Sequence, residues 1–499
     1  MSLVTGNGAS GPFARTLGEW ISGGSRSWSS IRLSRARDAI LDVTACMLAG
    51  SVTRETGLAL AVMQAECSGD HSIVGRQERL AESAAALVNG TAAHSLDYDD
   101  NFEPAFAHAS AVLVPALYAV GETRDASGRD LLDAYLVGLQ VMARVGFGIN
   151  PVHRMIGWHA TSTVGTIGVA AGCARVLGLT AEQATSALSI ATSSAAGSTA
   201  QFGTDVKPLH AGFAARAGVL AARLAAAGVR GSEDIFEHRL GFRQLYLGGK
   251  KRIRELRDRY PEESENWPFR FDAEDLDARH AIETHGLALK RWPNCGSAHA
   301  IMQAFLDLLA DHGLGPEAVR KLRVTTLRTV LDNLRYTTPA TPVEARFSLP
   351  WALACLLSDG ELTLSHFEPA ALGRPDLLRC LERIEIEGVE KTPHHRSVRE
   401  WAGYIEITTE GGELLDCDAT WPQAPGTTSN PLDQKELADK FLECAARAAS
   451  AADAGDLLRL LQRLESVAST RSLMAHLRGA PADRHPQTSG GQALTTEPS

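Results

Sequence analysis

Residues 205–222 read DVKPLHAGFAARAGVLAA, and this alanine- and glycine-rich stretch decides the fold of the first half of the chain. Small side chains let neighbouring helices approach closely, and Gly228 stands where such a helix would end. Helical spacing recurs upstream, for example at Ile40, Thr44 and Leu48. The first 230 or so residues are therefore predicted to form one helix after another, in a compact all-helical domain.

The pattern changes near residue 270. Residues 318–330 alternate Val, Thr and Leu with charged side chains, and residues 381–391 and 402–409 do the same, which is typical of strands. The pair Gly411-Gly412 predicts a hairpin after the last of these. Helical patterns accompany these strands, so this part is predicted to be a smaller α/β unit.

These patterns predict a mainly α protein with four parts. They are a helical domain in residues 1–275, an inserted α/β lid domain in 280–420, C-terminal helices in 430–478 that pack back on the helical domain, and a disordered tail in 479–499, which is polar and rich in Pro, Gly and Ser.

The composition narrows the class of protein. The chain has 499 residues and a formal net charge of −10, which argues against a nucleic-acid binder but not against a small anionic ligand in a local pocket. Eight scattered cysteines without a CxxC pair are typical of reduced structural thiols. With no basic leader and no apolar run of about 20 residues, we expect a cytoplasmic protein that does not enter a membrane.

Residues 94–108, HSLDYDDNFEPAFAH, carry four carboxylates and two histidines but no lysine or arginine. Crowded carboxylates need a proton, hydrogen bonds or a cation. We favour a functional role for Asp97 and His108, as a carboxylate and a histidine that handle a proton, and a turn-capping role for Asp99 and Asp100.

A metal site is the alternative interpretation of this stretch. Histidine nitrogens and carboxylate oxygens are credible ligands, and the candidates are His94, Asp97, Asp99 and His108.

Two further motifs place a basic side chain at a predicted helix start. His159 precedes a glycine-rich helix, whose N-terminus attracts carboxylates and favours a neutral imidazole, although the ring could simply pack on Trp158. Lys207 is the first of only eight lysines and stands beside Pro208, so it could hold an anion, although most lysines are merely solvated.

Two later motifs are weaker on their own. In KRWPNCGSAH (290–299), His299 would begin a helix, and Cys295 is more often structural than nucleophilic. In EARFSLP (344–350), no chemistry follows from the residues alone, and Tyr336 lies upstream.

Taken together, these motifs resemble the MmgE/PrpD family, which includes 2-methylcitrate dehydratase, cis-aconitate decarboxylase and iminodisuccinate epimerase. The resemblance covers about residues 35–420, and the order and spacing of the motifs carry it. The motifs are NGTAAHSLDYDD (89–100), HASAVLVPA (108–116), GWHATSTVGTIGVAAG (157–172), DVKPLHAGFAARAGVLAA (205–222), KRWPNCGSAH (290–299) and EARFSLPWALA (344–354).

The resemblance implies a homodimer whose active site lies between a helical domain and an α/β lid and needs no metal or other cofactor. The catalytic positions that match the family are Asp97, His108, His159, Lys207 and His299. The predicted substrate-binding residues are Asn101, Tyr336, His210 and Arg346. Two departures stand out: Asn101 replaces a threonine that is frequent in the family, and one additional residue lies within Glu103–Ala107.

The expected activity is that of a cofactor-independent carbon–oxygen lyase that dehydrates a 2-methylcitrate-like hydroxy acid. Basic side chains such as Lys207 would bind the substrate carboxylates, and His108 or His159, positioned by Asp97, would move a proton next to one of them. Decarboxylation or epimerisation of a similar polycarboxylate is the alternative. Two further alternatives, which the motifs support less, are a metal-dependent hydrolase and a non-catalytic helical scaffold.

Overall fold

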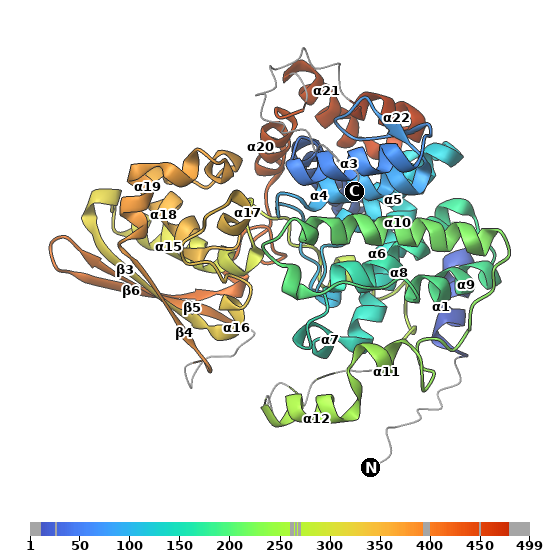
Figure 1. Ribbon diagram of the computed structural model, residues 1–499, viewed down its shortest axis with the longest axis horizontal. Helices are drawn as coiled ribbons and strands as arrows, with labels where there is room; N and C mark the ends of the chain where they lie inside the picture. The colour runs from blue at the N-terminus through green and yellow to red at the C-terminus, as the bar shows by residue number, and fades with distance from the viewer. Residues whose placement is uncertain are drawn as a thin grey trace, which may run out of the picture.

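The computed structural model describes residues 11–24, 27–259, 264, 267, 271–392, 400–448 and 451–478. The tail expected in residues 479–499 lies outside the described residues. Figure 1 shows two parts side by side, a larger helical part and a smaller part built on a sheet.

The helical part carries most of the first 285 residues. Its longer helices are α1 (Phe13–Ser22), α2 (Ser30–Gly50), α3 (Arg54–Glu66), α4 (Glu82–His94), α5 (Ala109–Arg124), α6 (Gly128–Ile149), α8 (Ala160–Leu177), α9 (Ala181–Thr192), α10 (Val206–Ala226) and α12 (Gly249–Arg259). Its shorter elements are the β1 (His71–Ser72) and β2 (Arg79–Leu80) hairpin, α7 (Val152–Met155), α11 (Phe242–Tyr246) and α14 (Ala281–Thr284).

Close packing of α10 against α4 and α8 depends on glycine. A Cβ atom added at Gly212 would collide with the carbonyl of Leu87 on α4, and one at Gly218 would collide with Val169 on α8. The helix backbones therefore approach closely only because these positions lack a side chain. This is the packing that the composition of residues 205–222 predicts.

Two of these helices, α6 and α8, are long and apolar enough to span a membrane. In both, 83% of the apolar window is buried inside the protein. Core helices of large domains show the same composition, and burial explains their apolar character here.

The smaller part is a four-stranded sheet with helices on one side (Figure 1). The strand order is β4 (Ile384–Val389), β3 (Val319–Leu327), β5 (Trp401–Thr409) and β6 (Leu414–Thr420); β3 and β4 are parallel and the other pairs antiparallel. The helices are α15 (His299–Asp311), α16 (Arg328–Leu331), α17 (Pro342–Ala345), α18 (Leu349–Asp359) and α19 (Pro375–Leu381). The predicted hairpin joins β5 to β6, with Gly412 at φ 86°.

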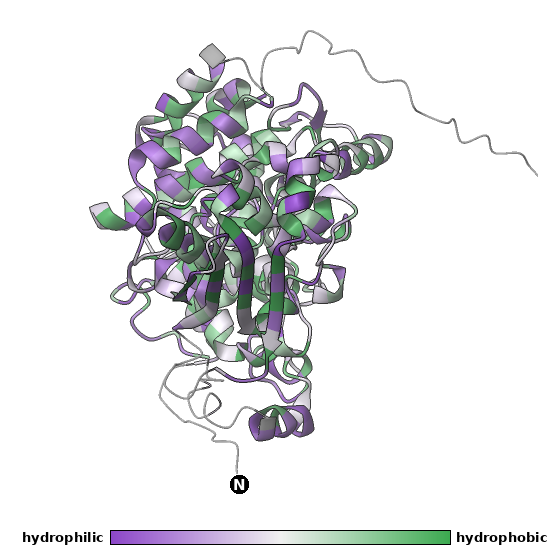
Figure 2. Cartoon of the chain, turned by 90° about the vertical axis from the view of Figure 1, so that its left-hand side faces the viewer, coloured by the Kyte–Doolittle hydropathy of each residue, from purple (hydrophilic) through white to green (hydrophobic). Residues whose placement is uncertain are grey.

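Alternation along the strands explains why one face of the sheet is covered. Leu322 and Val324 of β3 are buried, while Arg323 between them is exposed and pairs with Glu387 of β4. Figure 2 shows this alternation of apolar and polar residues along the strands. The apolar face packs on the helices and the polar face meets solvent.

The chain returns to the helical part after the sheet. Residues of α20 (Gln434–Ala445), α21 (Ala451–Leu461) and α22 (Thr470–Leu477) lie in the same buried apolar cluster as α2, α5 and α6. A separate cluster, drawn from residues 292–424, forms the core of the sheet unit. The sheet unit is therefore inserted between two stretches of one helical core.

Candidate active site

Four helix ends meet at the site. α4 ends at His94, while His108 and His159 are the residues immediately before the first turns of α5 and α8. Lys207 is in the first turn of α10. Helix N-termini carry unsatisfied N–H groups and positive potential, so three of them at one place favour an anion.

Asp97 supplies the central carboxylate. Its Oδ1 accepts a hydrogen bond from Lys207 Nζ at 2.6 Å and lies 3.1 Å from Lys290 Nζ, which also donates to the carbonyl of Asp97 at 2.7 Å. Burial opposes ionisation, but the two ammonium groups outweigh it and hold the pKa of Asp97 well below its usual range. The missing counter-charge of the acidic stretch thus comes from distant lysines.

Lys290 was not among the predicted site residues, although Lys207 was. Its side chain is 1% exposed, and it lies in a motif that carried the family resemblance. Lysine is rare in this chain, so its scarcity was a signal for both residues. A third buried lysine, Lys440, lies in the same neighbourhood.

Lys440 joins three segments behind the site. Its Nζ donates to the carbonyls of Tyr98 and Lys290, both at 2.8 Å, and lies 2.6 Å from Asp42 Oδ1. We call the pair of Asp42 on α2 and Lys440 on α20 the Lys440 clasp. It holds the turn after α4 against the segment that carries Lys290.

Asp99 has a different role from the predicted one. The sequence favoured turn capping, but Asp99 Oδ2 lies 2.7 Å from His94 Nδ1 and 3.4 Å from His108 Nδ1; Asp99 and His94 are buried and His108 is half-buried. Burial opposes ionisation, yet the histidines lower the pKa of Asp99. The prediction fails because only the fold brings both histidines to this carboxylate.

Asp100 does cap a helix. Its carboxyl accepts the backbone N–H of Ser110 at 3.3 Å and the Ser110 hydroxyl, in the first turn of α5. Burial is the main cause that raises the pKa of Asp100 to about 7. This carboxyl is therefore partly protonated near neutral pH.

The histidines form a second layer of the site. The His94 ring lies 4.5 Å from the His108 ring and 5.8 Å from the His159 ring, between centroids. His159 Nδ1 and His210 Nδ1 lie 2.9 Å apart. Burial lowers the pKa of His159 well below its usual range and that of His210 to about 4. The sequence predicts a neutral imidazole for His159 because of the helix N-terminus, but burial is the main cause in the structure.

The site cavity is too narrow for a substrate in this structure. Its volume is about 10 Å³, which is no more than one water molecule needs. It is lined by His94, Ser95, Asp97, Thr204, Lys207, Pro208, Val343, Arg346 and Phe347. Since both parts of the molecule supply this wall, a substrate can enter only if they move apart.

The sheet unit contributes a cation and an aromatic cover. Arg346 is 7% exposed, and burial lowers the pKa of its guanidinium to about 10, so it remains charged at neutral pH. Phe347 of the sheet unit and Phe202 of the helical part lie 5.1 and 5.4 Å from Lys207 Nζ, measured to the ring centroids. The two rings exclude water from one side of the lysine.

The predicted site residues His108, His159 and His210 do not line the cavity, and neither do three others. His299 Nε2 lies 2.9 Å from Asn294 Oδ1. Tyr336 lies against Gly203, where an added Cβ would collide with the phenol ring. Asn101 pairs through its backbone with Ala288, and its amide faces Gly296.

A metal ion could also find ligands here. Two sets of side chains have ligand atoms within 4.8 Å of one another: His94, His108 and His159, and His94, Asp97, Asp99 and His108. The second set includes Asp97, whose charge two lysines already compensate. This favours an anion pocket over a cation site for the lysine side of the cavity.

Comparison with known proteins places the chain in a family. The MmgE/PrpD N-terminal domain matches residues 16–254, and the MmgE/PrpD C-terminal domain matches residues 292–466. The chain belongs to the MmgE/PrpD family. The boundary between the two matched domains falls where the helical part gives way to the sheet unit, and the mainly α fold agrees with this membership.

Two similar proteins carry the name cis-aconitate decarboxylase, and a third is named as a decarboxylase-like protein. Cis-aconitate decarboxylase of Homo sapiens is 29% identical over 465 residues, which cover 90% of each chain. Cis-aconitate decarboxylase of Aspergillus terreus is 25% identical over 82% of this chain and 84% of its own. The cis-aconitate decarboxylase-like protein oryM of Aspergillus oryzae is 26% identical over 90% of this chain and 93% of its own.

Proposed function

We propose that this protein is a decarboxylase of cis-aconitate or of a closely related unsaturated tricarboxylate. The dehydration of a 2-methylcitrate-like acid, expected first from the sequence, has less support, because the similar curated proteins are cis-aconitate decarboxylases. The observation that carries the proposal is the cationic wall of the cavity, where Lys207 and Arg346 are buried beside His94, with Lys290 behind it on Asp97.

Decarboxylation at this site would need charge stabilisation and one proton. The bond between a CH₂ carbon and its carboxylate breaks, CO₂ leaves, and the electron pair shifts the neighbouring double bond. Negative charge then develops on the carbon next to another carboxylate, and a proton bound there completes a five-carbon dicarboxylate. Lys207 and Arg346 are placed to stabilise the developing charge, which is where buried cations act most strongly.

A histidine is the proton donor in this scheme. Burial lowers the pKa of His108 and of His159 in the empty site, so both are neutral there. A bound tricarboxylate adds negative charge nearby and favours the protonated form. The donor would therefore take up its proton together with the substrate and deliver it after CO₂ has left.

Proton NMR in deuterium oxide tests the proposal. The purified protein is incubated separately with cis-aconitate, 2-methylcitrate and iminodisuccinate. We expect CO₂ release from cis-aconitate only, with one deuterium in a methylene group of the product. Water loss from 2-methylcitrate without CO₂ release from cis-aconitate would contradict the proposal and support a dehydratase. Deuterium exchange into iminodisuccinate without net change would indicate an epimerase.

Metal analysis tests the remaining class of function. A stoichiometric metal ion whose removal by a chelator abolishes turnover would contradict the lysine-based scheme and support the histidine cluster as a metal site. We expect turnover to survive chelation.

A further inference from the structure

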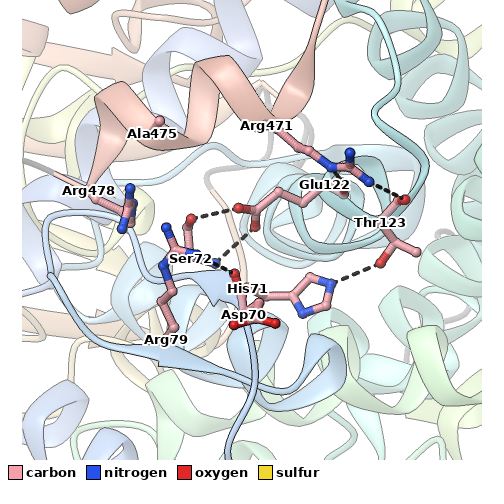
Figure 3. Close-up of a pocket in the computed structure, with 9 residues that line it drawn as sticks. All are labelled: Asp70, His71, Ser72, Arg79, Glu122, Thr123, Arg471, Ala475 and Arg478. Atoms are coloured by element: carbon pink, nitrogen blue, oxygen red, sulfur yellow. Dashed lines mark hydrogen bonds between the residues drawn. The ribbon is translucent and has the colours of Figure 1, made fainter.

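A second pocket lies apart from the catalytic cavity, among the β1–β2 hairpin, the C-terminal end of α5 and the helix α22. Its volume is about 500 Å³, large enough for a small organic ligand. Figure 3 shows the residues that line it: Asp70, His71, Ser72, Arg79, Glu122, Thr123, Arg471, Ala475 and Arg478.

Three arginines line this pocket: Arg79 on β2, and Arg471 and Arg478 at the two ends of α22. Among the described residues, no carboxylate forms an ion pair with Arg79, Arg471 or Arg478. The guanidinium of Arg471 donates hydrogen bonds to the backbone carbonyls of Glu122 and Thr123, at 2.9 and 3.2 Å. Arg79 has only a 3.5 Å contact to the carbonyl of Asp70, and Arg478 Nε is buried without a partner.

The acids of the pocket do not cancel this charge. Both carboxylate oxygens of Glu122 already accept hydrogen bonds from Ser72, at 2.9 Å from its N–H and 2.6 Å from its hydroxyl. Asp70 is the other acid of the lining. The lining carries three guanidinium groups and two carboxylates and is therefore positive in a chain of net charge −10; Asp125, outside the lining, acts on Arg471 and not on Arg79 or Arg478. Unpaired arginines in a concave site are suited to bind oxyanions bidentately.

We propose that this pocket binds a small multivalent oxyanion, with Arg79 and Arg478 as its principal ligands. Polyphosphates and polycarboxylates share the required chemistry. The pocket is distinct from the catalytic cavity: α5 begins at Ala109, directly after His108 of the histidine cluster, and ends at Arg124, directly after Thr123 of the pocket, and its 16 residues span about 24 Å. The anion would therefore bind in addition to the substrate of the proposed decarboxylase.

Isothermal titration calorimetry of the full chain tests this proposal with tripolyphosphate and with citrate as separate probes. We expect saturable binding of at least one, and Arg79→Gln and Arg478→Gln should each weaken it at least about 10-fold, as the loss of a charge-assisted hydrogen bond does. Which probe binds tells a phosphate from a carboxylate ligand. Arg471 is not varied, because it caps α5.

Two control variants show whether the anion binds at this pocket or elsewhere on the protein. Arg129 is an exposed arginine outside the pocket lining, so Arg129→Gln should leave the affinity unchanged. Lys207→Met removes a cation of the catalytic cavity and should leave the affinity for tripolyphosphate unchanged; citrate can also enter that cavity, so this control applies to tripolyphosphate alone. The proposal is overturned if neither probe saturates, if Arg129→Gln weakens binding as much as Arg79→Gln, or if Lys207→Met abolishes the binding of tripolyphosphate.

Discussion

Asp97 illustrates how single residues make this site. Its backbone adopts φ 51°, a conformation that few residues other than glycine and asparagine adopt readily, and this turns its carboxylate toward Lys207 and Lys290. Its Oδ2 is buried without a hydrogen-bond partner. Such an atom is costly in an empty site and becomes satisfied when a ligand supplies a donor or a proton.

At the residue scale, Lys207→Met is expected to lower kcat/KM for cis-aconitate by about 10²–10³, because it removes a cation aimed at developing negative charge. The variant should still fold, since Lys290 still compensates the negative charge of Asp97. The rate of CO₂ release measures the effect. Lys435→Met, at an exposed lysine paired with Asp439, is the matched control and should retain full activity. Equal activity of the two variants would argue against the proposed role.

The buried histidines predict how stability depends on pH. Burial lowers the pKa of His153, His210 and His280 to about 4 each and that of His299 to about 3. Between about pH 4 and 6.5 the unfolded chain binds more protons than the folded one, so the free energy of unfolding should fall as pH falls through this window.

Urea unfolding at pH 7.5, 6 and 5 measures this dependence through the transition midpoint. Asp100 acts in the opposite direction, because its raised pKa lets the folded state hold a proton that the unfolded state has lost. Asp100→Asn should therefore make the loss of stability toward pH 5 steeper. A midpoint that stays constant or rises on acidification would contradict the assignment of buried neutral histidines.

At the scale of elements, helix ends build the site and a remote ion pair holds them. α2 and α20, which are separated by almost 400 residues in the chain, meet at the Lys440 clasp. Its ammonium group also lies 4.0 Å from the ring centroid of Tyr98, the residue after Asp97. The clasp thus sets the position of Asp97 relative to Lys290 without touching the cavity lining.

We expect Lys440→Met to lower the free energy of unfolding by about 3–5 kcal/mol, because it leaves the carboxylate of Asp42 buried and unpaired. The double variant Asp42→Asn/Lys440→Met should recover part of this loss, since no charge remains buried. Its kcat/KM should still be below that of the parent, because the carbonyls of Tyr98 and Lys290 have lost their common donor. Urea unfolding and CO₂ release measure the two effects.

A fully active double variant would show that the clasp contributes only stability. Lys435→Met on the same helix is the control for both measurements, since that lysine is exposed.

At the scale of the whole molecule, an apolar surface lies on the helical part. α3 exposes Leu58 and Val62, and the neighbouring α10 exposes Phe213, Leu220 and Leu224. Arg216 of α10 donates to Met63 of α3 at 3.5 Å, so the two helices are adjacent. We propose that this face joins two copies of the chain in the homodimer that the family resemblance implies.

The variant Val62→Glu/Leu220→Glu is expected to shift the protein toward a monomer in sedimentation velocity, because charge would be buried in the interface. Leu414→Glu, at an equally exposed leucine of β6, is the control and should remain dimeric. A parent protein that sediments as a monomer, or an unchanged dimer in the double variant, would exclude this face.

Much of the fold follows from local pattern, but little of the site geometry does. The helices of residues 30–226, the strand that begins near 319 and the glycine hairpin after β5 are visible in the sequence because periodicity and turn residues act over a few positions. The pairing of Asp99 with His94 and His108, and the presence of Lys290 beside Asp97, could not be read this way. The first depends on the exact path of an irregular loop between α4 and α5, and the second on two segments that are 193 residues apart in the chain.

The sequence by itself determined the kinds of element, the close packing of glycine-bearing helices, and the side chains available for chemistry. Only the tertiary structure decided which of these side chains meet: it brought Lys207, Lys290 and Arg346 to one acidic turn and formed a narrow cavity that both parts of the molecule line. The physical reason is that helix periodicity depends on residues a few positions apart, so it can be recognised in the sequence. The charge balance of a buried site depends instead on how distant elements pack, and the sequence determines that packing only through the whole fold.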